Sequence, residues 1–307
     1  MALAASNTAV SPLAERAAGI AQLGRDASIE INVHDVGHLE ESRAWLPPGK
    51  AVYVSHLPKQ QWSETEAACR AVRAAGFRPV PHVPVRLLPD AATADRLLGA
   101  FVDNAQVDEV LLISGDYAQS LGPYTEVLQV LNSGLLQRHG LRRVSVAGHP
   151  EGHPKVGLAD IRRAELDKAR MAQQAGLELT LLTQFFFEPA PFLDWVGELR
   201  SAGVTARVVG GLAGPTKLST LIKFAMRCGA GASMRVLTAR PAAFTKLLGD
   251  HGPESVLTAL AQARGEATGD FAGVHLFCFG GFVRTCRWLQ AIAEGRFRLD
   301  DADGFKV

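Results

Sequence analysis

The chain has 307 residues, of which 47% are hydrophobic and 21% charged, so it can bury a large core and wholesale disorder is excluded. At about 150 residues per domain, this length suits two ordinary domains or one barrel of about 250 residues with extensions. The net charge of +1 provides no basic excess, which excludes nucleic acid as the expected partner. The four cysteines show no CxxC spacing, which argues against a disulfide scaffold and a structural zinc site.

Neither a membrane span nor an export signal is indicated by the sequence. No apolar run reaches the roughly 18 residues that a membrane helix needs. Export signals of secreted proteins consist of a basic segment followed by an apolar one, and the first residues of this chain lack that pattern. We therefore expect a cytoplasmic protein with no membrane partner and with flexible residues 1–10. The sequence does not fix the oligomeric state, and a homo-oligomer is compatible with it.

Helical and extended patterns alternate along the chain. Ser11 and Pro12 are typical of a helix start and predict a helix over 12–23. Short apolar runs predict strands at 28–33, 51–55, 78–83, 109–113, 143–147, 178–183, 205–209 and 274–279. Helical spacing between these strands predicts helices near 63–75, 91–105, 122–138, 158–175, 190–202, 215–228 and 282–294. The long interval 230–272 predicts extra helices near 241–248 and 253–263.

Eight strands separated mostly by steps of βα size predict an α/β fold, a TIM (β/α)8 barrel, with an N-terminal helix and extra helices before the last strand. No repeat or linker divides the chain, so residues 1–307 are expected to form one domain. The competing architecture is an open doubly wound sheet. That fold favours a glycine-rich phosphate loop, and neither GxGxxG nor GxxxxGK[ST] is present.

Polar side chains occur near the ends of the predicted strands, where a parallel barrel places its active site. The residues in question are Glu30, His82, Asp116, His149, Gln184 and His275. Polar groups at the mouth of an apolar core need partners or a ligand. These strand ends are therefore the main functional signal in the sequence.

Each of the candidate side chains has a structural and a functional interpretation. Glu30 is either a carboxylate bonded to a neighbouring strand or a general acid whose pKa burial raises. Asp116 is either a helix N-cap or a site carboxylate. Gln184 is either a turn residue or an amide that pairs with the edge of a heterocycle.

A metal site is not expected, although His149, Glu151 and His153 form an HxExH pattern. Prolines interrupt this pattern, and the helical zinc signature HExxH is absent. Acyl chemistry at a serine finds no GxSxG motif either.

Several collinear segments between residues 28 and 290 together resemble the methylenetetrahydrofolate reductase family. Ser28-Ile29-Glu30 is similar to the family's S-F-E, and Ser114-Gly115-Asp116 to its R-G-D. The most specific segments are 147–154, AGHPEGHP, which resembles A-x-Y-P-E-x-H-P, and 183–188, TQFFFE, which resembles T-Q-x-F-F-D. Residues 81–83, PHV, and 273–276, GVHL, resemble the family's H-L-T and G-x-H-x-Y-T segments.

The resemblance implies a TIM barrel that binds FAD and interconverts 5,10-methylenetetrahydrofolate and 5-methyltetrahydrofolate by hydride transfer from flavin N5. Glu30 would be the general acid that protonates N10, and Asp116 would stabilise the iminium cation. Tetrahydrofolate derivatives would contact Gln184, Asp116, Phe186 and Leu218. FAD would contact His82, Arg86, Ser114, Gly115, Tyr124, Ala147, His149, His153, Lys168 and Arg170.

The chain also departs from the family pattern. Residues 31–34, INVH, replace F-F-P-P, and 54–59, VSHLPK, replace T-Y-G-A-G-G. Leu218 takes the place of a phenylalanine that stacks on the nicotinamide or the folate tail, and leucine offers no π face. We therefore expect a divergent member with altered use of NAD(P)H. The alternatives are a folate-linked one-carbon (methyl) transfer enzyme without flavin, and a catalytically silent folate- or flavin-binding subunit.

Overall fold

A computed structural model describes residues 11–115, 117–217, 220–221, 252–264, 269–300 and 304–307. The expected flexible segment 1–10 and the predicted helix 241–248 lie outside this described part, as does most of the predicted helix 215–228.

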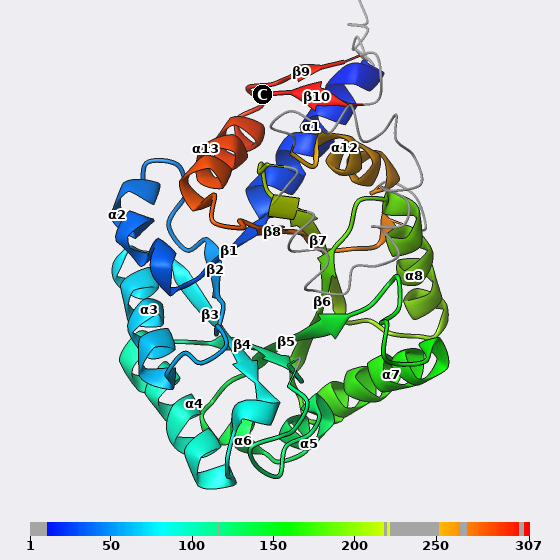
Figure 1. Ribbon diagram of the computed structural model, residues 1–307. Helices are drawn as coiled ribbons and strands as arrows, with labels where there is room; N and C mark the ends of the chain where they lie inside the picture. Colours follow the sequence, from blue (N-terminus) through cyan, green and yellow to red (C-terminus); the bar gives the residue numbers. More distant parts are fainter. Residues whose placement is uncertain (1–10, 116, 218–219, 222–251, 265–268, 301–303) are drawn as a thin grey trace, which may run out of the picture.

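Eight parallel strands form a closed barrel in sequence order, which confirms the predicted TIM barrel (Figure 1). The strands are β1 (Ser28–Ile31), β2 (Ala51–Val54), β3 (Arg78–Pro84), β4 (Glu109–Ile113), β5 (Arg143–Gly148), β6 (Glu178–Phe185), β7 (Arg207–Ala213) and β8 (Gly273–Phe277). The barrel closes where β1 pairs with β8, with Ser28 opposite His275.

Helices surround the strands as an outer ring in Figure 1. In chain order the helical elements are α1 (Pro12–Asp26), η1 (Val33–His38), α2 (Leu39–Ser42), α3 (Trp62–Ala74), η2 (Val85–Leu87), α4 (Ala91–Ala105), α5 (Val127–Leu131), α6 (Leu135–Arg138), α7 (Leu158–Gln174), α8 (Pro189–Ser201), α12 (Glu254–Ala263) and α13 (Phe282–Ala293). Helix α1 packs against α12 and α13, beside the short hairpin of β9 (Arg298–Leu299) and β10 (Phe305–Lys306).

The alternation of side chains along each strand separates two cores. On β1, Ile29 and Ile31 are 0% and 2% exposed and belong to the large apolar layer between the barrel and the helices. Ser28 and Glu30 occupy the opposite face, which is the barrel interior, because successive strand residues point to opposite sides. The sequence pattern of β1 thus places a carboxyl group inside the barrel.

The amino-terminal end of the barrel interior is filled by a hydrogen-bonded cluster around Glu109. Its carboxylate accepts hydrogen bonds from Tyr53 (3.3 Å), Ser145 (2.6 Å) and Arg78 (2.7 Å), and Glu109 is 5% exposed. Because every oxygen of this buried carboxylate is satisfied, the cluster closes this end of the barrel. The opposite end, at the carboxyl termini of the strands, is where a ligand site is expected.

Candidate active site

A carboxylate and two imidazoles meet inside the barrel near the carboxyl ends of the strands. The Nε2 atom of His82 on β3 lies 3.3 Å from Oε2 of Glu30 on β1, and the Nε2 atom of His275 on β8 lies 3.7 Å from the same oxygen. The exposed fractions of the three side chains are 19% for Glu30, 12% for His82 and 0% for His275. We call these three residues the Glu30 cluster.

The Glu30 cluster holds polar atoms that nothing in the described chain satisfies. Glu30 Oε2, His82 Nε2 and His275 Nε2 are buried and make no hydrogen bond of good geometry with any described residue. Buried polar atoms without partners are costly, so their presence needs an explanation. A bound molecule that supplies hydrogen-bond donors and acceptors to these three atoms is one such explanation.

The ionisation of Glu30 differs from the sequence-based expectation. Burial alone would raise the pKa of the Glu30 carboxyl group, in line with the functional interpretation from the sequence. The adjacent His82 and His275, together with Ser55, outweigh burial and hold the pKa of Glu30 below its usual value. Burial in turn lowers the pKa of His82, although Glu30 opposes that change. The free protein therefore holds Glu30 as a carboxylate, which corrects the expectation of a raised pKa.

Gln184 lies at the carboxyl end of β6, where the strand is irregular. The pairing of β6 with β7 shifts register between Leu182 and Phe185. Within this irregularity Thr183 Oγ1 accepts a hydrogen bond from the backbone N–H of Gly211 at 2.8 Å. The side chain of Gln184 is exposed, and its Oε1 accepts the backbone N–H of Phe185 at 3.2 Å. The amide N–H2 group of Gln184 is thus presented at the barrel mouth.

Aromatic rings form one wall at the carboxyl ends of β6 and β8. Phe185 makes edge-to-face contacts with Phe277 and Phe279 at centroid distances of 6.0 and 5.1 Å. Phe277 also contacts the imidazole of His275 at 4.8 Å. Phe186, the expected substrate contact, instead stacks on Phe192 of α8 at 5.0 Å and lies in the layer between barrel and helices rather than at the mouth.

The predicted cofactor residues after β3 and β4 form a connected loop. Gly115 adopts a φ of +84°, which favours glycine. Arg86 donates hydrogen bonds to the carbonyls of Tyr117 (3.0 Å) and Thr125 (2.9 Å), so its guanidinium holds the loop after β4 in place. Ser114 precedes the turn, and Tyr124 is buried at 7% exposure. Asp116 and Leu218 lie outside the described residues.

A buried glutamate that sequence reasoning missed holds the loop after β5. Glu165 of α7 is 1% exposed and accepts hydrogen bonds from the backbone N–H of His149 (2.8 Å), from Trp195 Nε1 (2.9 Å) and from Arg162 (3.1 Å). Burial alone would raise the pKa of Glu165, but the His149 imidazole, Trp195, the His149 backbone N–H and Arg162 together outweigh burial and keep that pKa below its usual value. A signal existed in the sequence: Glu165 falls four residues after Ile161, on the buried face of the predicted helix 158–175.

The remaining predicted cofactor residues fall into two groups. Ala147 is on β5, and the His149 ring meets the His153 ring edge-to-face at 5.9 Å, so these three residues surround the end of β5. On α7, Lys168 is half-buried and burial lowers its pKa, with Glu165 and Glu126 opposing that effect. Arg170, by contrast, is exposed and pairs with Asp167 at 2.9 Å, on the outer surface of the helix.

The segment after β2, where the sequence departs from the family pattern, is internally packed. The ring of His56 stacks on Trp62 at 3.9 Å, and its Nδ1 lies 2.7 Å from Thr65 Oγ1. Burial lowers the pKa of His56 to about 4, and the neighbouring His82 acts in the same direction. His56 is therefore a neutral, packed ring at neutral pH.

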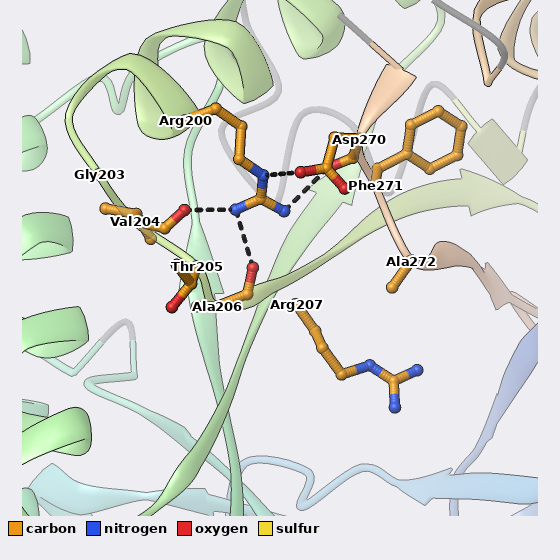
Figure 2. Close-up of a pocket in the computed structure, with 9 residues that line it drawn as sticks. All are labelled: Arg200, Gly203, Val204, Thr205, Ala206, Arg207, Asp270, Phe271 and Ala272. Carbon is orange, nitrogen blue, oxygen red and sulfur yellow. Dashed lines mark hydrogen bonds and ion pairs between the residues drawn. The ribbon is translucent and has the colours of Figure 1, made fainter. Parts of the chain in front are cut away.

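One cavity of about 330 Å³ lies at the other end of the barrel, at the amino-terminal ends of β7 and β8. Figure 2 shows Arg200 at its rim, hydrogen-bonded to the carbonyls of Val204 and Ala206 and paired with Asp270. These bonds tie the loops before β7 and β8 together. Because this end of a parallel barrel is generally a stability face, we assign the cavity a structural role.

Among the described residues, no group of three or more His, Cys, Asp or Glu side chains is arranged to hold a metal ion. None of the helices in the described part of the chain combines the length and the apolar character needed to cross a membrane.

A closed parallel barrel with ionisable side chains at the carboxyl ends of its strands places the chain in the (β/α)8-barrel class. No protein-family model matches the chain. A solved structure, dihydropteroate synthase from Thermus thermophilus, superposes with a TM-score of 0.49 at 13% identity, over 87% of this chain and 93% of that one.

Two methylenetetrahydrofolate reductases share sequence with the chain. Methylenetetrahydrofolate reductase 2 of Saccharomyces cerevisiae is 24% identical over 166 residues, which are 52% of this chain and 26% of the yeast protein. Methylenetetrahydrofolate reductase (NADH) 1 of Arabidopsis thaliana is 29% identical over 119 residues, 34% of this chain and 20% of that protein. The matched regions thus span about a quarter or less of each relative. These matches support a divergent member of the methylenetetrahydrofolate reductase family.

Proposed function

We propose that this protein is a flavin-dependent oxidoreductase that interconverts 5,10-methylenetetrahydrofolate and 5-methyltetrahydrofolate. The observation that carries the proposal is the Glu30 cluster, with its buried, unsatisfied polar atoms at the barrel mouth. The sequence similarity to methylenetetrahydrofolate reductases supports the choice of substrate. One continuous domain over 1–307 and a cytoplasmic location are part of this proposal.

The residues around β3, β4 and β5 fit a flavin dinucleotide. Lys168 makes no hydrogen bond or ion pair with any described residue. Burial lowers the pKa of its amino group, because it disfavours the charged form. A phosphate next to this amino group would stabilise the charged form. His82, Ser114, Gly115, Tyr124, Ala147, His149 and His153 would line the same cofactor, and Arg86 would hold the adjoining loop. When bound, the reduced flavin supplies the hydride.

The chain's own part in the reaction is to move a proton and to stabilise a cation. Opening the imidazolidine ring of the substrate breaks the bond between the methylene carbon and N10, which requires a proton on N10. Glu30 would donate that proton, because substrate binding displaces water from the cluster and so raises the pKa of the carboxyl. In the opposite direction the ionised Glu30 accepts the proton that N10 loses on ring closure.

Three further residues complete the proposed site. Asp116, which follows β4 in the sequence, would place a negative charge beside the iminium cation left by ring opening. Gln184 would pair its exposed amide with the pterin edge, which offers both donors and acceptors. Leu218 would provide an apolar contact in place of an aromatic ring, and we propose altered use of NAD(P)H on that basis.

The test begins with the absorption spectrum and the mass of the small molecule that co-purifies with the full chain. We expect flavin bands and the mass of FAD. Glu30→Gln should retain the flavin but slow electron exchange with 5,10-methylenetetrahydrofolate by about 10²–10⁴-fold, the usual contribution of a general acid.

Glu109→Gln is the matched control, because it makes the same change inside the same barrel at its closed end. It should leave the exchange rate within a few-fold of the wild-type rate. A protein that binds no flavin, or a Glu30→Gln variant that exchanges electrons at the wild-type rate, would refute the proposal. A flavin-free chain that still transfers a methyl group from folate would establish the transferase alternative.

A further inference from the structure

The Glu30 cluster extends deeper into the barrel through Ser28. The hydroxyl Oγ of Ser28 lies 2.8 Å from Nδ1 of His275, across the pairing of β1 and β8 that closes the barrel. Two rings fix the plane of this imidazole: Tyr53 meets it at 4.7 Å and 66°, and Phe277 at 4.8 Å and 84°. The His275 side chain has no exposed surface, so these contacts surround the ring on all described sides.

The contacts at the two nitrogens distinguish the two neutral tautomers of His275. If Nδ1 carried the proton, it would donate to Ser28, and the lone pair of Nε2 would face the carboxylate oxygen of Glu30 3.7 Å away. Two acceptors would then oppose each other in a buried site, which is unfavourable. If Ser28 donates to Nδ1, the proton is on Nε2 and points toward Glu30, so a donor rather than a second acceptor faces the carboxylate.

We propose that His275 is a positioning residue for Glu30: the acceptor oxygen of Glu30 selects the Nε2–H tautomer, Ser28 donates to Nδ1 and anchors the ring, and the Nε2–H, together with His82, holds the Glu30 carboxylate in the barrel mouth. The importance of this arrangement for turnover rests on the proposed function. The tautomer of His275 and the ionisation of Glu30 do not depend on the proposed function, and both can be measured in the unliganded chain.

Other groups near Glu30 do not replace this role. Asp35 of η1 is a buried acid whose carboxylate accepts the backbone N–H of Asn32 at 3.0 Å. Burial raises the pKa of Asp35, and the nearby charge of Glu30 acts in the same direction, so Asp35 does not favour the Glu30 carboxylate. Cys278 follows β8, and burial raises the pKa of its thiol well above the usual value, which leaves it neutral. Ser55 adds a hydroxyl that lowers the pKa of Glu30. The imidazoles are therefore the main groups that favour the carboxylate.

The direct test is the tautomer of His275 by ¹⁵N–¹H correlation spectroscopy of the imidazole rings in the full chain, assigned through His275→Gln. We expect a protonated Nε2 and an unprotonated Nδ1 in the wild type. In Ser28→Ala the hydroxyl donor is gone, and we expect the proton to stay on Nε2 while the ¹⁵N shift of Nδ1 moves to that of a nitrogen without a hydrogen bond. A wild-type ring protonated at Nδ1, or an unchanged Nδ1 shift in Ser28→Ala, would overturn the proposal.

The second test compares two amides at position 275. The side-chain nitrogen of glutamine reaches about as far as Nε2 and can still donate to Glu30, whereas that of asparagine reaches only about as far as Nδ1. The Glu30 carboxyl band in the infrared spectrum is assigned by its loss in Glu30→Gln and is followed against pH. We expect His275→Asn to raise the proton affinity of Glu30 about tenfold, a shift of one pKa unit, and His275→Gln to leave it nearly unchanged.

Equal titration in the two variants would contradict the positioning role, because a purely structural histidine would not distinguish them. Both measurements are made without flavin or folate. If the tautomer and the titration behave as expected but the chain shows no folate turnover, the positioning role stands and the proposed function fails. If the chain turns over folate but His275→Asn and His275→Gln titrate alike, the proposed function stands and the positioning role of His275 fails.

Discussion

Replacing Glu165 by alanine should destabilise the protein far more than an ordinary loss of an acidic side chain. The carboxylate is 1% exposed and accepts hydrogen bonds from His149 N–H, Trp195 Nε1 and Arg162. Glu165→Ala leaves the backbone N–H of His149 and the Nε1–H of Trp195 without their acceptor in a buried site, whereas Arg162 keeps Glu198 and the carbonyls of His149 and Pro150. Each buried unsatisfied donor costs about 1–3 kcal/mol, and breaking a buried ion pair costs about 3–5 kcal/mol in all. Since the effects overlap, we expect a loss of about 3–5 kcal/mol in the free energy of unfolding.

Glu198→Ala provides the matched control for this prediction. Glu198 binds the same guanidinium, Arg162 Nε, at 3.1 Å, but its side chain is 62% exposed. Exposed ion pairs contribute at most about 1 kcal/mol, so this variant should lose less than that. Urea unfolding, read from the midpoint and the slope, gives both values.

The pH dependence supplies an independent check on Glu165. Its pKa in the folded protein is below the usual 4.5, so the stability it contributes is present above pH 4.5 and is lost as the pH falls through the folded-state pKa. Glu165→Gln should therefore lose less stability on acidification than the wild type. If Glu165→Ala and Glu198→Ala had equal free energies of unfolding, the assignment of Glu165 as the anchor of the loop after β5 would be refuted.

Two other predictions concern packing and acid sensitivity. Gly148→Ala should destabilise the protein by about 1–3 kcal/mol, because a Cβ at this position would lie 2.4 Å from Trp195. Gly197→Ala in α8 has no atom within 4 Å of the added Cβ and should stabilise the protein by up to about 1 kcal/mol. Thermal unfolding measures both variants, and equal unfolding midpoints would contradict the predicted clash. Folding lowers the pKa of His56 from 6.5 to about 4, so the unfolded chain takes up a proton at this residue at a higher pH than the folded chain does. The free energy of unfolding should therefore fall by about 2–3 kcal/mol between pH 6.5 and pH 4. His56→Gln should remove most of that loss in melts at pH 7 and pH 4.5, and an unchanged loss would show that His56 is not its source.

The barrel could be predicted from the sequence because its elements are specified locally. The run 109–113 and the helix 91–105 are found with the predicted bounds, since a short apolar run and a helical stripe each determine their own element. The predicted helix 122–138 is wrong in its extent. It is replaced by two short helices, α5 and α6, because Gly134 adopts a φ of +72° and Arg86 holds the preceding segment as a loop.

The site was only partly predictable, because its properties depend on contacts between distant segments. Glu30 could be singled out as a carboxyl group inside an apolar strand. The direction of its pKa could not, since it is set by imidazoles that β3 and β8 bring to the same oxygen. Likewise, the pattern TQFFF does not reveal which ring faces inward. The register shift between Leu182 and Phe185 decides that Phe185 joins the wall at the mouth while Phe186 packs on Phe192.

The pairing of Ser28 with His275 has a consequence for how the protein is made. These residues are separated by 247 positions, so the ribosome must release nearly the whole barrel before the two can meet. Until then β1 has no β8 to pair with, and Glu30 on β1 faces solvent rather than the imidazole of His275. Contacts this remote in sequence form slowly. The chemistry of Glu30 would thus appear only at the last stage of folding, and its titration could serve as a reporter of barrel completion during synthesis.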